Sequence, residues 1–149
     1  MDDSKRVDQF VCVVNKKIDP AKLINAVAHM SAGLVNRNIN AGDIDKMRFR
    51  DFFDMDKSPH PSISENGFII LRSDNSNKLR TLRKTLIEKG ILFTDFTNVM
   101  VEGNHITQQR EFDRIKEEEL EYLGVCFFMN IDESRELTKK FSIYKPQID

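Results

Sequence analysis

The chain has 149 residues, of which 40% are apolar and 32% are charged. A chain of this length buries roughly 68–70% of the surface that its unfolded form exposes, so it can fold around one hydrophobic core. The composition excludes a disordered tail and a fibre, and no apolar run reaches the roughly 20 residues of a membrane span. Lys and Arg number 23 against 24 Asp and Glu, a balance that offers no overall positive charge to a phosphate backbone.

The first residues, MDDSKRVD, are acidic and polar, so we expect neither a signal peptide nor a transit peptide and predict a cytoplasmic protein. Cys12 and Cys126 each lie in an apolar run typical of a buried strand. We expect two free thiols in a reducing cytosol, with a disulfide as the alternative. Glycine motifs for nucleotides and strong metal-ligand spacings do not occur, so we expect no cofactor and no metal.

The clearest predicted unit is a strand followed by a helix. Phe10–Val14 is a continuous, largely β-branched run, as expected for a strand covered on both faces. Asp19 can cap the helix that follows, and Pro20 fits its first turn. Gly33 is predicted to end it. The apolar stripe of this helix, at a 3.6-residue period, consists of Leu23, Val27, Met30 and Leu34.

The middle of the chain is less regular. Residues 36–45 are polar and rich in turn formers, and Met47–Met55 carries aromatic residues with mixed periodicity. We interpret Met47–Met55 as a short strand or an ordered loop. Ser58–Gly67 contains two prolines and reads as a loop, and Phe68–Leu71 reads as a second core strand.

The second half alternates helices and strands. One helix is predicted with Asp74, Ser76 or Asn77 as its N-cap and with its end at Gly90. The other predicted helices are His105–Glu121 and a short one from Asp132, as its cap, through Lys140. The remaining predicted strands are Ile91–Phe96, Leu123–Met129 and Phe141–Tyr144. This order predicts one α/β domain over residues 1–149, with a mixed four- to five-stranded sheet flanked by helices.

Polar residues gather where the first strand meets its helix. Asn15 and Lys22 lie near the carboxyl end of the strand, where open α/β sheets bind ligands and a helix N-terminus favours anions. Asn25 and His29 are four residues apart, so both project from one side of the helix. The imidazole could carry a proton at neutral pH. Alternatively, His29 only donates a hydrogen bond to a nearby carbonyl.

A second candidate is the acidic stretch that contains Asp51, Asp54, Asp56 and His60. Carboxylates with an imidazole could hold a divalent metal, or a carboxylate could orient His60 as a base. The spacing matches no strong metal signature. The simpler interpretation, which we favour, is an acidic loop whose carboxylates bind their own backbone N–H groups.

The third candidate is the basic side of the second helix. These cations could meet phosphate or RNA, but no aromatic residue interleaves with them, so we favour a solvated surface. Accordingly, tRNA and membranes are not expected partners, whereas a homo-oligomer remains open. The basic residues are Lys78, Arg80, Arg83, Lys84 and Lys89.

At this point the pattern resembles a known family. The stretch from Val11 to Leu34 is similar to the opening of the domain-of-unknown-function-two-thousand family, in which a Val-rich strand ends in Asn and leads into Asn-Ala-x-x-His-x-x-x-Gly-Leu. The acidic loop with its His-Pro segment and the closing Tyr-Leu-Gly and Thr-Lys-Lys-Phe strands also fit. The matching residues of the opening are Asn15, Asn25, Ala26, His29, Gly33 and Leu34.

That family is similar in fold to the peptidyl-tRNA hydrolases of archaeal and eukaryotic type, so the resemblance implies a peptidyl-tRNA hydrolase II-like sheet. Lys22 and His29 match the first helix of those enzymes, and Asp95 falls on the Asp of their Asp-Ala-Gly. Gln9 and Ala26 stand where they have Lys and Gln. A neutral Gln9 cannot supply a positive charge to an oxyanion.

Three functions follow from these observations. The first is the binding, with or without hydrolysis, of a small polar ligand at the first strand–helix junction. The second is a non-catalytic interaction or dimerisation module, and the third is residual peptidyl-tRNA hydrolysis. For the first, the candidate catalytic residues are His29, Asn25 and Asp95, and the candidate ligand contacts are Asn15, Lys22, Asp56 and His60.

Overall fold

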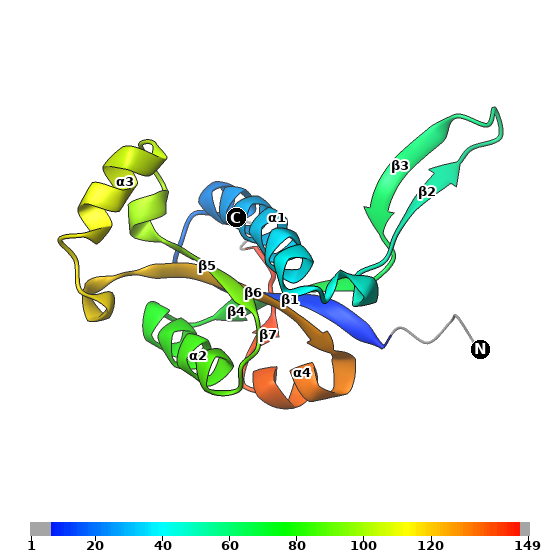
Figure 1. Cartoon of the computed structure of the whole chain (residues 1–149). Helices are drawn as coiled ribbons and strands as arrows, with labels where there is room; N and C mark the ends of the chain where they lie inside the picture. Colours follow the sequence, from blue (N-terminus) through cyan, green and yellow to red (C-terminus); the bar gives the residue numbers. More distant parts are fainter. Residues whose placement is uncertain (1–6, 147–149) are drawn as a thin grey trace.

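A computed structural model describes residues 7–146 and shows an α/β domain built on a mixed five-stranded sheet (Figure 1). The sheet order is β5-β6-β1-β4-β7, in which β1 and β4 are parallel and the other neighbours are antiparallel. The sequence predicts four to five strands in the sheet, and the structure has five. The strands are β1 (Asp8–Asn15), β4 (Gly67–Ser73), β5 (Phe93–Thr97), β6 (Tyr122–Asn130) and β7 (Ser142–Ile143).

Helices cover both faces of this sheet (Figure 1). On one face, the long helix α1 packs its buried stripe against the apolar side chains of β1 and β6. On the other face, α2 and α4 cover the sheet, and three leucines of α2 enter the core. The helices are α1 (Pro20–Ala41), α2 (Ser76–Glu88), α3 (His105–Phe112) and α4 (Ile131–Thr138). None of the helices described is long and apolar enough to cross a bilayer.

The first helix is longer than predicted. Gly33 does not end α1, which continues to Ala41 and closes on Gly42, whose φ of 78° is the left-handed conformation that glycine adopts readily. Gly33 instead lies where α1 approaches β5. A Cβ atom there would sit 3.4 Å from the Thr94 side chain, so the missing side chain permits close packing.

The segment predicted as a loop after Ser58 is a strand. β2 (Phe49–Phe53) and β3 (Pro59–Ser64) form a two-stranded antiparallel hairpin, which we call the arm. The strand alternative for Met47–Met55 is therefore confirmed, and the loop prediction for Ser58–Gly67 is wrong. A half-buried strand shows alternating apolar and polar residues, because only one of its faces is buried. Neither face of the arm is buried, so its sequence lacks the alternation that would have predicted a strand.

Three local predictions also need correction. The helix predicted over His105–Glu121 ends at Phe112, and the chain then turns into a short 3₁₀ helix at Glu117–Glu119. The N-cap of α2 is Asn75, whose side chain accepts from the Lys78 N–H. The N-cap of α4 is Asn130 rather than Asp132. At both N-caps, a neighbouring Asn side chain accepts N–H groups of the first helical turn, which is what an N-cap residue does.

The two cysteines are free and fully buried, as predicted. They lie directly opposite each other on the antiparallel pair β1 and β6. The hydrogen bond to Cys126 and burial raise the pKa of the Cys12 thiol well above its ordinary value. Both thiols therefore act as small apolar core groups.

Candidate functional site

The junction between β1 and α1 forms one wall of a pocket of about 450 Å³, which we call the junction pocket. Asp19 caps α1 by accepting from the Ala21 N–H at 3.1 Å, and Pro20 begins the helix, both as predicted. Lys22 lies in the first turn and lines this pocket. The opposite wall comes from residues 98–102 and from β6, and the polar lining is Lys17, Asp19, Lys22, Asn98, Glu102, Glu111 and Glu121.

A second pocket, of about 420 Å³, lies two turns further along α1, and we call it the histidine pocket. His29 is exposed and lines it, and its ring lies 5.7 Å from the Phe96 ring. The ring is thus neither sealed in the core nor bonded to main chain within the described residues. The other lining residues are Met30, Thr94, Asp95, Phe96, Met100, His105, Gln108, Gln109 and Phe112.

One segment, residues 98–112, takes part in both pockets, because different residues of this segment line each of them. The Gln108 amide donates to the carbonyls of Met100 (3.2 Å) and Glu102 (3.1 Å). At the start of α3, Asn104 and Thr107 form a reciprocal capping box. These bonds brace the segment, so the pockets are preformed rather than created by a loose loop.

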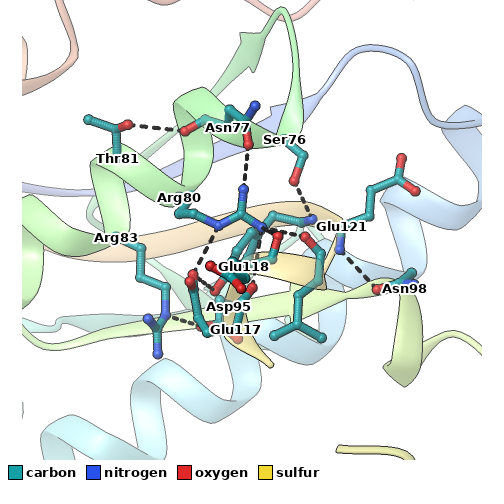
Figure 2. A network of polar contacts seen from close by, with 12 residues as sticks. Ser76, Asn77, Arg80, Thr81, Arg83, Asp95, Asn98, Glu117, Glu118 and Glu121 are labelled. Atoms are coloured by element: carbon teal, nitrogen blue, oxygen red, sulfur yellow. Dashed lines mark hydrogen bonds and ion pairs between the residues drawn. The ribbon is translucent and has the colours of Figure 1, made fainter. Parts of the chain in front are cut away.

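Figure 2 shows a polar network that includes Asn98 and Glu121, two residues of the junction-pocket lining. The Arg80 guanidinium of α2 donates to the Glu117 carboxylate at 3.1 Å and to the Leu120 carbonyl at 2.5 Å. The Tyr122 hydroxyl donates to the same carboxylate at 2.8 Å. Asn98 and Glu121, which line the pocket, are joined by two hydrogen bonds involving the Glu121 main chain.

This network also determines the titration of its members. Burial raises the pKa of Glu117, but the Tyr122 hydroxyl and the Arg80 charge lower it more, so the pKa lies below its ordinary value. Burial and the bond to Glu117 raise the pKa of the Tyr122 phenol far above its ordinary value. Two cations on the basic side of α2 already have partners within the chain, because Arg80 binds Glu117 and Arg83 binds Asp95. These two charges are therefore less available to an external phosphate.

The raised pKa of Tyr122 gives a testable pH dependence. Because the folded state holds this proton more tightly, its contribution to stability is complete below pH 10 and is lost as pH rises further. The chain has no Trp and two Tyr, so phenolate absorbance reports these two residues cleanly. We expect a late ionisation that coincides with unfolding, measured by ultraviolet titration alongside circular dichroism. Tyr122→Phe should remove it and Tyr144→Phe should keep it. A late phase that survives Tyr122→Phe contradicts the assignment.

The structure divides the predicted site residues into groups. Lys22 lines the junction pocket and His29 the histidine pocket, while Asn25 lies exposed between them on α1 and lines neither. Asp95 borders the histidine pocket, but its carboxylate accepts from Arg83 at 2.9 Å. Asn15 is buried. Its amide donates to the Tyr122 carbonyl at 3.1 Å and its oxygen accepts from the Lys17 N–H at 3.0 Å.

Asp56 and His60 lie on the arm, which Figure 1 shows projecting away from the sheet, and they line neither pocket. His60 bonds Asp54 at 2.9 Å, and Asp54 accepts the N–H groups of Asp56 and Ser58. These bonds, led by that of His60, lower the pKa of Asp54. The bonds from backbone N–H groups to Asp54 agree with the favoured interpretation of a self-capping acidic loop, and the bond to His60 agrees with the alternative that a carboxylate orients this imidazole. Across residues 7–146, no three His, Cys, Asp or Glu side chains gather as metal ligands would.

Sequence reasoning missed His105, Gln108 and Phe112, which α3 contributes to the same pocket as His29. One signal was available, because the chain has three histidines and two of them meet in this pocket. No spacing connects His29 with His105, since they come from separate elements. Only the tertiary fold reveals the pair.

Comparison with known proteins assigns the chain to a family. The profile described as "Protein of unknown function (DUF2000)" matches residues 8–145, so the chain belongs to this family, as the sequence resemblance indicated. No curated protein matches it. A solved protein of unknown function from Agrobacterium tumefaciens strain C58 is similar in fold, with a TM-score of 0.75 and 12% identity over 93% of this chain and 98% of that one.

Proposed function

We propose that the protein binds a small polar ligand along α1, in the histidine pocket, with the junction pocket accepting an extension of the same ligand. The observation that carries the proposal is that His29 is exposed in a pocket of about 420 Å³ that a second imidazole, His105, also lines. Ligand sites are typically concavities of about 300–1,000 Å³ with mostly apolar walls and a few convergent polar groups. Met30, Phe96 and Phe112 provide apolar walls here.

The spacing along α1 supports one continuous site. Lys22 and His29 are seven residues apart, which is two helical turns and about 10 Å along one side of the helix. A ligand of that length would meet an ammonium group at one end and an imidazole at the other. Asn25 projects from the same side between them and could donate or accept a hydrogen bond.

The two imidazoles support proton transfer as the chemistry of this site. A neutral imidazole accepts a proton at one ring nitrogen and donates from the other, so His29 could activate water while His105 donates to a leaving group. Hydrolysis of a small ester or amide is the reaction class that this arrangement favours. Asp95 supports β5 behind the pocket through Arg83 instead of acting as the base.

The likeness to peptidyl-tRNA hydrolases stays a prediction about fold. Position 9, which corresponds to their strand Lys, carries a Gln whose amide donates to Ser134 of α4 at 2.9 Å. Helix α4 lies on the sheet face opposite α1 (Figure 1), so this side chain does not approach His29. Gln9 thus argues for a different substrate from peptidyl-tRNA.

The proposal is tested by screening carboxylated, phosphorylated and amide-containing metabolites by heteronuclear NMR against the wild type and His29→Ala. We expect shifts at residues 22–30 and 98–112 and at least tenfold weaker binding in His29→Ala, since a charge-assisted hydrogen bond is worth about 1.5–3 kcal/mol. His60→Ala is the matched control, because it removes an exposed imidazole of the arm and should bind normally. Shifts confined to other surfaces, or binding unchanged by His29→Ala, contradict the proposal.

A further inference from the structure

The arm is an apolar hairpin without a covering layer. Phe52 and Phe53 are 53% and 63% exposed, and Met55 at the turn is 96% exposed. Successive residues of a strand point to opposite faces, so each face of the arm presents an aromatic ring to solvent. Figure 1 shows the arm projecting from the body on the same side of the sheet as α1.

The arm has no buried apolar core of its own that would stabilise it. A two-stranded hairpin alone is at best marginally stable in water, and contiguous exposed apolar surface typically marks an interaction site. Its base is nevertheless fixed. Asn66 is buried, accepts from the Arg48 N–H at 2.7 Å and donates to the carbonyls of Lys46 (3.2 Å) and Asp8 (3.3 Å). The arm therefore leaves the body in a defined direction.

The body has an uncovered apolar face on the side toward which the arm rises. Helix α1 lies over β5 and β6, where Thr94 donates to the Met30 carbonyl, and leaves β4 open. Phe68 of β4 stacks on Phe10 at 5.3 Å yet stays 42% exposed, and Ile24 on the adjacent side of α1 is 72% exposed. The short strand β7 pairs with Leu71 and Arg72, and the Tyr144 N–H that follows it donates to the Ile70 carbonyl at 3.0 Å. Residues 67–69 at the start of β4 therefore lack an outer strand neighbour within residues 7–146.

We propose that two copies of this chain form a dimer in which the arm of each copy covers the β4 face of the other. One chain carries both the projecting apolar element and the open apolar face, so a single two-fold axis buries both at once and closes the assembly. A standard interface uses about 20–30 residues on each side. The arm, residues 49–64, supplies at most 16 residues of each side, and the β4 face of the same copy adds to them.

Charge complementarity favours the same partner. The turn of the arm carries Asp54, Asp56 and Lys57, a net negative charge, whereas β4 carries Arg72 on the same strand face as Phe68. Lys145 follows Tyr144, whose N–H donates to the Ile70 carbonyl of β4. Arg72 forms no ion pair with the described residues. An exchanged arm would bring its acidic turn toward these cations, a pairing of opposite charges that steers association.

Light scattering coupled to size exclusion, at up to about 100 μM protein, tests the dimer directly. The wild type should have twice the mass of one chain. Phe52→Ser/Phe53→Ser in the arm and Phe68→Ser on the face should each weaken dimerisation at least tenfold. All three positions are already exposed, and circular dichroism verifies that the variants fold. Ile87→Ser, an equally exposed apolar residue on α2 across the sheet, is the matched control and should stay dimeric.

Mixing separates arm-to-face exchange from pairing of two arms. The arm variant retains a normal face and the face variant retains a normal arm, so an equimolar mixture should form heterodimers that keep one of the two contacts. A wild-type monomer overturns the proposal, and so does a dimer that survives Phe52→Ser/Phe53→Ser. A face variant that dimerises as well as the wild type shows arm-to-arm pairing and also overturns it.

Discussion

Arg80→Ala is expected to lower the free energy of unfolding by about 2 kcal/mol, because removing the guanidinium from a half-buried, charged hydrogen-bond network leaves its acceptors unpaired. The Arg80 side chain is 13% exposed and the Glu117 side chain is 39% exposed, so solvent partly screens this ion pair. Its loss leaves the Glu117 carboxylate with Tyr122 and leaves the Leu120 carbonyl without its guanidinium donor. Urea denaturation followed by circular dichroism measures the effect.

Arg135→Ala is the matched control for this prediction. Arg135 lies 76% exposed on α4, and its nitrogen is 3.9 Å from the Asp132 carboxylate. Exposed pairs of this kind contribute about 0–1 kcal/mol, so the variant should unfold nearly as the wild type does. Equal destabilisation by Arg80→Ala and Arg135→Ala would show that the network adds no stability. Arg80→Lys should be intermediate, because an ammonium group keeps the charge but loses the planar fork.

The elements predicted well from sequence are those whose pattern reflects burial. The apolar run of β1 and the leucine spacing of α2 correspond to strands and helices that pack on the sheet. Burial imposes a period on the sequence, and the period then predicts the element. The end of α1 was predicted wrongly at Gly33, because a glycine looks the same in sequence whether it ends a helix or lies where the helix packs closely on a strand, here β5.

The second strand of the arm was predicted as a loop, and α3 was predicted too long, because burial imposes no clear pattern on these segments. The arm has no buried face in the described structure, so its sequence has no alternation to detect. If the arm packs on a second copy, the information that stabilises it lies partly in the other chain. The stretch after Phe112 has many helix-favouring charged residues, but Arg80 binds the carbonyls of Glu117 and Glu118 and holds that stretch in a tight turn.

For the candidate site, residue spacing predicted the side chains that α1 contributes but not those that α3 contributes. Lys22 and His29 share one side of α1, which helical geometry alone reveals. His105 reaches the same pocket only through the path of residues 98–112 across the edge of the sheet. Asn15 was predicted as a ligand contact because it follows a core strand. The structure shows that the same position also suits a side chain that closes the strand end.

Asn15→Ala should separate that structural role from ligand binding. The side chain is 1% exposed and bonds one carbonyl and one N–H, of Tyr122 and Lys17. Because both groups lose their partner, we expect a loss of about 2–3 kcal/mol in unfolding free energy, measured by urea denaturation. Asn25→Ala, on the exposed side of α1, should stay within about 0.5 kcal/mol of the wild type. If Asn15→Ala is as stable as Asn25→Ala, the amide is not required to close the strand end, and its burial beside the junction would again favour a role in binding.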